Sequence, residues 1–189
     1  MKVFGIDVSK WNGDFDFVKA KSEGVKFAIL RGAYACSKDI KFEAYYVACK
    51  GLQIPVGVYH YSMAKDVTEA RAEANFLIQN VLKGKQFEYP IYMDVEDKTQ
   101  AALGKDKLTE IITAFCDTVE KAGYYVGIYS STSFFQSYTH LNKLERFDKW
   151  VAHWAKSCSY KGDYGMWQFG GETNVIRSNK VAGVVCDQD

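Results

Sequence analysis

The segment Ile54-Pro55-Val56-Gly57-Val58-Tyr59-His60-Tyr61 is a short apolar run that ends in polar and aromatic side chains. Such a run is typical of a strand buried on both faces, as strands of parallel sheets are. Its proline, Pro55, lies near the start of the run, where a missing backbone N–H is tolerated. A second segment, Val126-Gly127-Ile128-Tyr129, repeats the pattern of an apolar strand that ends in tyrosine. Both segments predict buried strands of a mostly parallel sheet.

Comparable apolar runs are spread along the whole chain and alternate with longer segments of helical spacing. Strands are expected at residues 3–7, 26–31, 54–61, 90–94, 124–129, 149–153, 165–169 and 183–187. Helices are expected at residues 15–23, 38–50, 67–82 and 107–122. This alternation is typical of βα units, and helical periodicity fades after Tyr129. The sequence therefore predicts an α/β fold, an irregular β/α barrel of about eight strands with reduced helices in its last third.

The composition is that of an ordinary globular protein, with 189 residues, 48% of them hydrophobic and 25% charged. At roughly 150 residues per domain this length favours one domain, residues 1–189, and no linker-like stretch divides the chain. The formal charge of +1 argues against a nucleic-acid binder and gives no support to a membrane-surface role. The longest stretch without charged residues, 122–142, is too polar to insert into a membrane.

The cysteines and histidines do not form a pattern that binds metal. The five cysteines are an odd number without a C-x-x-C pair, so they are expected to be mostly buried thiols. The three histidines lie far apart and include no H-E-x-x-H motif, so no metal site is expected. Residues 1–8 run directly into a strand and carry Asp7, which leaves no apolar core for a signal peptide. Export by another route, or a mature or trimmed chain, is compatible with this start.

Polar side chains follow several of the predicted strands, and four of them are carboxylates: Asp7, Asp94, Glu96 and Asp187. In a barrel of parallel strands, the carboxyl ends bring residues from distant sequence positions to one face. For any single aspartate, the alternative to a functional role is a solvent-exposed position at a strand end. Four carboxylates on three strands favour a shared site, because like charges held together perturb each other's pKa values.

The motif Asp94-Val95-Glu96 is the most informative part of this set. Residues two apart in a strand point to the same face, with Cα atoms roughly 7 Å apart, so both carboxyl groups are expected in one pocket. Mutual repulsion keeps one carboxyl protonated beside an ionised partner. An acid for the leaving oxygen and a charge that stabilises a cationic centre are what glycoside hydrolysis requires. A D-x-E motif alone is also compatible with a solvated strand end.

Motifs along nearly the whole chain resemble glycoside hydrolase family 25, the lysozymes also called Chalaropsis-type muramidases and found in many bacteriophage endolysins. The matching elements are Gly5-Ile6-Asp7-Val8-Ser9, Phe27-Ala28-Ile29-Leu30-Arg31-Gly32, 56–61, Asp94-Val95-Glu96, 128–130, Val151-Ala152-His153-Trp154, Trp167-Gln168-Phe169 and Val185-Cys186-Asp187-Gln188-Asp189. The resemblance implies a flattened, irregular, TIM-barrel-like fold. It also implies cleavage, with retention, of the β-1,4 bond between N-acetylmuramic acid and N-acetylglucosamine in peptidoglycan. The last motif departs from the family at Asp189, where asparagine is common.

The resemblance also implies roles for the carboxylates. Glu96 corresponds to the general acid/base, and Asp94 to the group that supports the reacting sugar, directly or by orienting its 2-acetamido group as an internal nucleophile. Asp7 and Asp187 are expected to complete an acidic floor that tunes Glu96 and holds substrate hydroxyls or the catalytic water. A structural hydrogen-bond network between the first and last strands is the alternative for these two.

The remaining candidates are expected to bind the glycan. Flat rings stack on pyranose faces, which makes Tyr61, Tyr129 and Trp167 candidates for the groove walls. Trp11 and Trp154 are compatible with either packing or substrate contact, and Gln168 belongs to the Trp-Gln element. Arg31 is expected to pair with the acidic floor or with muramyl carboxylates, with a structural ion pair as the alternative. The expected substrate-binding set is Tyr61, Tyr129, Trp167, Gln168, Arg31, Trp11 and Trp154.

The expected function is therefore a retaining muramidase without metal or organic cofactor. Its expected partner is the glycan strand of bacterial peptidoglycan, with no nucleic acid, no membrane insertion and no separate wall-binding domain, and the expected form is a monomer. Without a signal peptide, the protein is expected to stay in the cytoplasm until a membrane pore or another export route releases it to the wall. A chitinase-like hydrolase is disfavoured, because its longer D-x-x-D-x-D-x-E motif is absent before Glu96. The alternative from another class is a catalytically silent carbohydrate-binding module.

Overall fold

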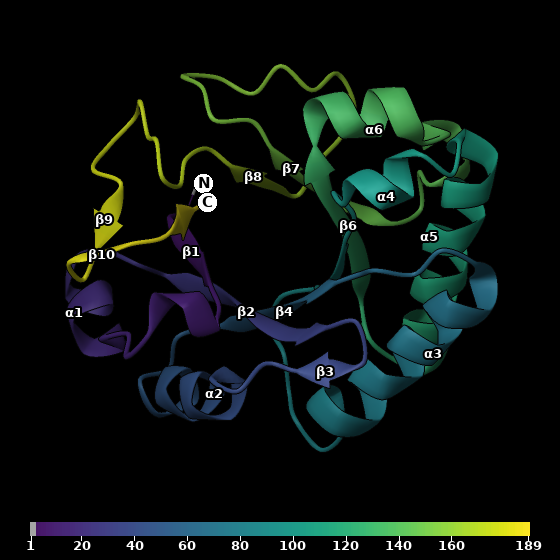
Figure 1. Cartoon of the computed structure of the whole chain (residues 1–189). Helices are drawn as coiled ribbons and strands as arrows, with labels where there is room; N and C mark the ends of the chain where they lie inside the picture. The colour runs from purple at the N-terminus through teal and green to yellow at the C-terminus, as the bar shows by residue number, and fades with distance from the viewer. Residues whose placement is uncertain (1–2) are drawn as a thin grey trace.

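The computed structural model describes residues 3–189, and its centre is one twisted sheet with the strand order β11-β1-β2-β4-β5-β6-β7-β8 (Figure 1). All neighbours from β1 to β8 are parallel, and β11 pairs with β1 in the antiparallel sense. The bounds are β1 Gly5–Val8, β2 Phe27–Tyr34, β4 Val56–Tyr61, β5 Ile91–Asp94, β6 Val126–Ser131, β7 Asp148–Ala152, β8 Met166–Gln168 and β11 Asp187–Gln188. The eight strands confirm the predicted α/β barrel.

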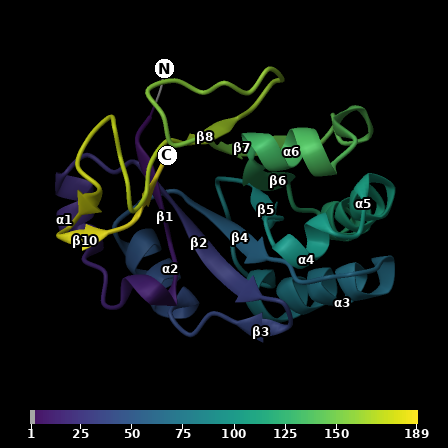
Figure 2. The same cartoon turned by 45° about the horizontal axis from the view of Figure 1, so that its top comes forward.

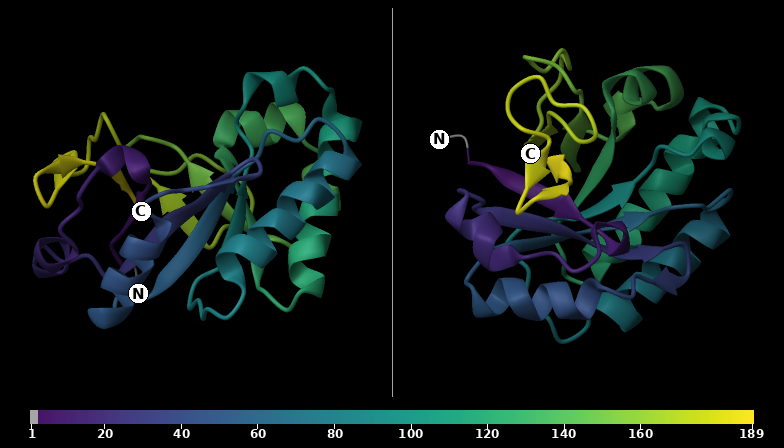
Figure 3. Two further views of the ribbon diagram at one scale, coloured as in Figure 1. Left: turned by 60° about the horizontal axis from the view of Figure 1, so that its bottom comes forward. Right: turned by 60° about the vertical axis from the view of Figure 1, so that its left-hand side comes forward.

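The two edges of the sheet are brought together by β11. On one side Asp7 pairs with Asp187 in the β1–β11 register. On the other side Gln188 bridges Gly170, just after β8, and the Gln188 N–H donates to the Gly170 carbonyl at 2.8 Å. The purple β1 and the yellow end of the chain lie side by side in both views of Figure 3. The barrel is therefore nearly closed by residues from the two ends of the chain.

The structure corrects the single strand expected at residues 183–187. This segment contains two short strands, β10 (Val184–Val185) and β11, and β10 forms a separate hairpin with β9 (Lys180–Val181). The hairpin turn uses positive φ angles at Ala182 (55°) and Gly183 (87°), which reverse the chain. The apolar run continues through this reversal, so periodicity alone could not divide it.

The predicted helices cover the outside of the barrel (Figure 2). They are α1 Phe17–Ser22, α2 Phe42–Gly51, α3 Val67–Leu77 with its π-helical extension η2 Ile78–Leu82, and α5 Lys105–Lys121. Asp16 and Asp66 begin α1 and α3 as N-caps, each accepting a backbone N–H three residues on. The structure adds two short helices, α4 Lys98–Ala101 and α6 Thr132–Tyr138, the 3₁₀ turns η1 Lys10–Asn12 and η3 Leu141–Lys143, and the two-residue strand β3 Ser37–Lys38. Within the described residues no helix follows η3, as expected for the last third.

Two apolar clusters hold the barrel. The larger lies between sheet and helices, and the smaller fills the lower interior with Phe27, Ile29, Tyr92, Tyr129, Trp150 and Met166. Trp150, 1% exposed, is the centre of the inner cluster, with ring centroids 4.4 Å from Tyr129 and 5.2 Å from Tyr92. This plug makes the barrel interior a packed core below its carboxyl end, so polar side chains above it lie on a rigid base.

The cysteines are free thiols, with Cys49, Cys116 and Cys186 buried, which confirms the expectation of mostly buried thiols. Over residues 3–189, no helix is long and apolar enough to cross a membrane. In the same range no cluster of three or more His, Cys, Asp or Glu side chains has the geometry to hold a metal ion. Met1 and Lys2, part of the N-terminal segment interpreted above, lie outside the described residues.

Candidate active site

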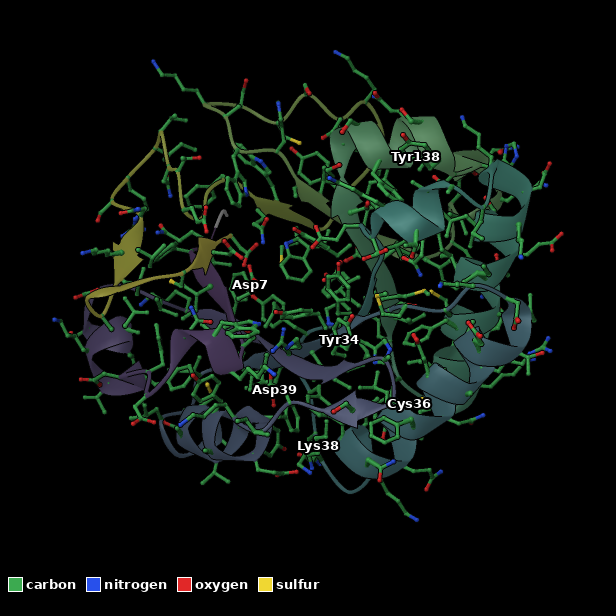
Figure 4. All side chains as sticks on the ribbon, viewed as in Figure 1. Asp7, Tyr34, Cys36, Lys38, Asp39 and Tyr138 are labelled. Atoms are coloured by element: carbon green, nitrogen blue, oxygen red, sulfur yellow. The ribbon has the colours of Figure 1, made fainter. Side chains whose placement is uncertain are left out.

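Four carboxylates meet at the carboxyl end of the barrel. Asp7 comes from β1, Asp94 is the last residue of β5, and Glu96 follows two residues later. Asp187 is the first residue of β11, and because this strand is antiparallel, its beginning lies at the same mouth where the other strands end. All four line one cavity of about 420 Å³, here called the acidic hollow. Figure 4 shows Asp7 pointing into the space that the strands enclose.

The four carboxyl groups differ in their access to solvent. Asp7 and Asp94 are 6% and 4% exposed, Asp187 is half-buried, and Glu96 is exposed. Asp94 lies between Tyr61 of β4 and Tyr129 of β6 in the sheet register, and its Oδ1 is buried without a hydrogen-bond donor from the described residues. The site therefore combines one accessible acid with a buried one two residues away.

Burial is the first cause of a raised pKa in all four groups. Burial followed by the charge of Glu96 raises the pKa of Asp94 well above its usual range, against the opposing charge of Arg31. Although Glu96 is open to solvent at the mouth, the surrounding walls partly desolvate its carboxyl, and this, followed by the charge of Asp97, raises the pKa of Glu96. Burial and the charge of Glu96 raise the pKa of Asp187 to about 6. Protonated carboxyls thus persist closer to neutral pH than in isolated side chains, as a general acid requires.

Gln168 of β8 connects the acids to the wall of the site. Its Nε2 donates to Asp7 Oδ2 at 2.9 Å, and its Oε1 accepts from Tyr129 Oη and Trp154 Nε1, both at 3.0 Å. Gln168 is 2% exposed, and these contacts occupy its carbonyl oxygen fully. Gln168 was predicted to bind substrate. In the structure its side chain orients the carboxyl of Asp7.

Arg31 forms the structural ion pair that was one of its alternatives. Its Nε and Nη2 both lie 2.7 Å from Asp39 Oδ2, and both residues are buried. The carboxyl of Asp39 also accepts the backbone N–H groups of Lys10 and Lys41. In Figure 4 Asp39 lies toward α2, away from Asp7. Arg31 still lines the acidic hollow, and its charge favours ionisation of Asp94.

A second hollow of about 600 Å³ adjoins the first. Glu96, Tyr129 and Gln168 line both hollows, and His153 and Trp154 line only the second. Glu96 therefore lies at the boundary between two spaces, each with room for a small polar ring system.

The aromatic candidates are placed at different depths. Trp11, 79% exposed, and the half-buried Tyr61 line the acidic hollow, whereas Trp154, 41% exposed, lines the second hollow. Tyr129 lines both but is 8% exposed and packs on Trp150.

The structure does not bring Trp167 to either hollow. Side chains alternate along β8, so Gln168 points into the barrel and Trp167 points away from it. Trp167 donates from Nε1 to the His153 carbonyl at 2.8 Å, packs against Phe169, and lines a separate hollow with Phe4.

The residues at or next to the site that were not among the candidates include Tyr34, Trp150, Glu172 and Asp189. Tyr34 is 46% exposed and stacks on Tyr61 with a centroid distance of 5.2 Å, because β2 extends three residues beyond its predicted end. Trp150 forms the base of the acidic hollow, and Glu172 lies on its rim. Asp189 is buried below Asp7. The cross-strand pair Tyr34–Tyr61 had a sequence signal in its two strand-end tyrosines, whereas Glu172 lies in a loop without one.

An accessible and a buried carboxyl at the mouth of an α/β barrel are the pair of acids that glycoside hydrolases use. A model of the family described as Glycosyl hydrolases family 25 matches residues 6–177. This chain therefore belongs to glycosyl hydrolase family 25, which confirms the resemblance seen in the sequence motifs.

Known proteins of similar sequence and structure agree with this membership. The chain is 27% identical to an autolytic lysozyme of Clostridium acetobutylicum, over 81% of this chain and 45% of that protein. It is 24% identical to lysozyme M1 of Streptomyces globisporus, over 99% of this chain and 66% of that protein. The modular autolysin LytC of Streptococcus pneumoniae, solved with a synthetic peptidoglycan ligand, superposes with a TM-score of 0.79 at 27% identity, over 99% of this chain and 45% of that one. The chain thus spans between about half and two thirds of these relatives.

Proposed function

We propose that this chain is an N-acetylmuramidase that hydrolyses the β-1,4 bond between N-acetylmuramic acid and N-acetylglucosamine in bacterial peptidoglycan, with retention. The observation that carries the proposal is the position of Glu96, exposed at the boundary of two hollows and two residues from the buried Asp94. Membership of the family and the similarity to two lysozymes and to an autolysin solved with a peptidoglycan ligand support it. The bacterial cell wall is accordingly the proposed place of action.

Glu96 is the proposed general acid. Its raised pKa favours a proton on the carboxyl, and its exposure lets that proton reach the oxygen that links two sugars. With the reacting sugar in the acidic hollow and the leaving sugar in the second hollow, the bond between them lies next to Glu96. After the leaving sugar departs, the ionised Glu96 takes a proton from the incoming water.

Asp94 is the proposed support of the reacting sugar. A buried acceptor without a donor, such as Asp94 Oδ1, is uncommon in a folded protein. The N–H of a 2-acetamido group would supply a donor to this carboxyl and favour its ionised form. The amide oxygen of the same group is then oriented toward the anomeric carbon as the internal nucleophile. The charge of Asp94 stabilises the cationic character of that step, while Asp7 and Asp187 hold hydroxyls or water.

The exposed rings are the proposed walls of the groove. Trp11 and the stacked pair Tyr34–Tyr61 flank the acidic hollow, and Trp154 flanks the second. Flat rings in these positions can pack on sugar faces. Residues 1–189 are proposed to act as one catalytic unit, because strands from both ends of this sequence supply the carboxylates of the acidic hollow. The proposed form is a monomer.

Digestion of purified Gram-positive peptidoglycan, followed by borohydride reduction and mass spectrometry, tests the proposal. Wild type is expected to release fragments that end in reduced muramic acid, whereas Glu96→Gln is expected to bind the polymer without cleaving it. Glu110→Gln makes the same chemical change on the exposed side of α5 and serves as the control. Reduced glucosamine would indicate a glucosaminidase. Binding without cleavage by wild type would instead support a silent carbohydrate-binding module.

A further inference from the structure

Asp189 is a fifth carboxylate inside the barrel, below the acidic hollow. Its backbone extends the pairing of β11 with β1, because its N–H donates to the Gly5 carbonyl at 3.1 Å and its carbonyl accepts the Gly5 N–H at 3.0 Å. Side chains alternate along β11, so Asp189 points to the same side as Asp187. The residue is 7% exposed.

The side chain of Asp189 has one donor and one carboxyl neighbour. Its Oδ1 accepts from Trp150 Nε1 at 2.8 Å, whereas Oδ2 is buried and receives no N–H or O–H from residues 3–189. Asp189 pairs with Gly5 and Asp187 pairs with Asp7, so Asp189 lies diagonally across the ladder from Asp7 on the same face, within reach of its side chain. The two carboxyl groups are in hydrogen-bonding contact, and Asp7 also accepts an N–H from Gln168. Two ionised carboxylates offer only acceptors, so a hydrogen bond between them requires a proton.

Among residues 3–189, no cation forms an ion pair with Asp7 or Asp189. Arg31, which lines the same interior, is bound to Asp39. Arg177 lines the separate hollow under Asp189, with its guanidinium stacked on Phe4 at 3.6 Å from the ring centroid. Two buried carboxyl groups in contact favour one shared proton over two charges, as other carboxyl pairs do.

We propose that Asp189 and Asp7 share one proton, and that Asp189 is in this way a positioning residue for the active site. The shared proton completes a continuous chain of hydrogen bonds across the barrel from Trp150 through Asp189, Asp7 and Gln168 to Trp154. The chain fixes the Asp7 carboxyl beside Asp187 and holds the Trp154 ring on the wall of the second hollow. The consequence for catalysis rests on the proposed muramidase function, whereas the sharing of a proton between Asp7 and Asp189 does not depend on it.

Loss of the proton at alkaline pH leaves two negative charges in contact and breaks this chain. Burial is the first cause of a raised pKa in both groups, with the charges of neighbouring aspartates next for Asp7. The pair is faced by several titratable and charged groups of the described residues. Inside the barrel these are Asp187, Cys186, Asp94, Tyr92, Tyr59 and Tyr129. In the hollow under Asp189 they are Tyr89, Tyr164, Arg177 and the exposed Lys156. Most of them are acids, so the surroundings favour retention of the proton.

Asp189→Asn is the variant that separates a shared proton from simple packing. Its amide can keep the Trp150 contact through Oδ1 and can donate a permanent N–H to Asp7, so the chain no longer depends on pH. We expect the melting temperature of Asp189→Asn, relative to wild type, to rise by about 3 °C or more between pH 5 and pH 8. The ratio of its kcat/KM on peptidoglycan to that of wild type should stay constant over this range and increase at alkaline pH, where wild type loses the shared proton.

Two further variants complete the test. Asp189→Ala removes both contacts and should lower kcat/KM about tenfold at every pH. Asp163→Asn, at an exposed position, should show neither effect. NMR of isotopically labelled aspartate carboxyls in wild type should show one protonated carboxyl among Asp7 and Asp189 at neutral pH, which tests the sharing even where a variant fails to fold.

The outcomes distinguish the inference from the function. Equal pH dependence of stability and activity in wild type and Asp189→Asn, or two ionised carboxyls at neutral pH, would overturn the shared proton. Wild type without any cleavage of peptidoglycan would overturn the proposed function, while the melting curves and the NMR titration would still decide whether the proton is shared.

Discussion

The buried ion pair between Arg31 and Asp39 offers a quantitative test of how the site is held together. Arg31→Met keeps most of the side-chain volume but removes the charge beside Asp39 Oδ2, at 2.7 Å. Removal of one partner of a buried pair costs about 3–5 kcal/mol. Asp39 retains two backbone donors, from Lys10 and Lys41, so we expect a loss at the lower end, about 3 kcal/mol in the free energy of unfolding.

Urea unfolding of Arg31→Met, Asp39→Asn and the double variant measures this loss and the coupling between the partners. The double variant leaves no buried unpaired charge and should lose less than the sum of the single variants, by about 1–3 kcal/mol. Arg31 also favours ionisation of Asp94, so its removal should move the acidic limb of the pH–activity profile to higher pH. A loss below about 1 kcal/mol, the range of exposed pairs, together with an unchanged acidic limb, would refute the reasoning.

Three other perturbations have defined outcomes. Asp94→Asn should reduce kcat by about 100-fold or more while binding to peptidoglycan persists, and an active variant would contradict the role of this carboxyl. Because the pKa of Asp187 is raised to about 6, its contribution to stability is present below the unfolded pKa and is lost as pH rises through about 6. The melting temperature of Asp187→Asn should therefore fall less than that of wild type over this range. Parallel melting curves would argue against a raised pKa of Asp187. Tyr34→Ala should raise KM severalfold without a loss of stability, because its ring is 46% exposed and stacks only at the rim; an unchanged KM would remove Tyr34 from the groove.

Local patterns in the sequence predict much of this fold, because the barrel is built from buried strands. The apolar runs that end at Tyr61 and Asp94 correspond to strands β4 and β5, and the helical spacing at 107–122 corresponds to α5. Convergence of Asp7, Asp94 and Glu96 follows from parallel strands alone, since their carboxyl ends meet at one mouth.

The remaining features depend on pairing between distant strands. Nothing in residues 183–189 indicates that β11 is antiparallel or that Asp189 lies buried below Asp7, because both follow from contacts with Gly5 and Trp150. Trp167 was expected in the groove because it stands next to Gln168, but adjacent residues of a strand point to opposite faces. Glu172 reaches the acidic hollow from a loop, where no periodicity applies.

Closure of the barrel by β11 also affects the order in which the fold forms. Asp7 and Asp187 are neighbours across a ladder, yet almost the entire chain lies between them, so their pairing has the largest loop to close. Strands β1 to β8 can associate in order as the chain emerges during synthesis, whereas the complete set of four acids requires Asp187, which follows all of these strands in the sequence. The complete acidic hollow is therefore expected to form late in folding, after the strands that carry it have associated.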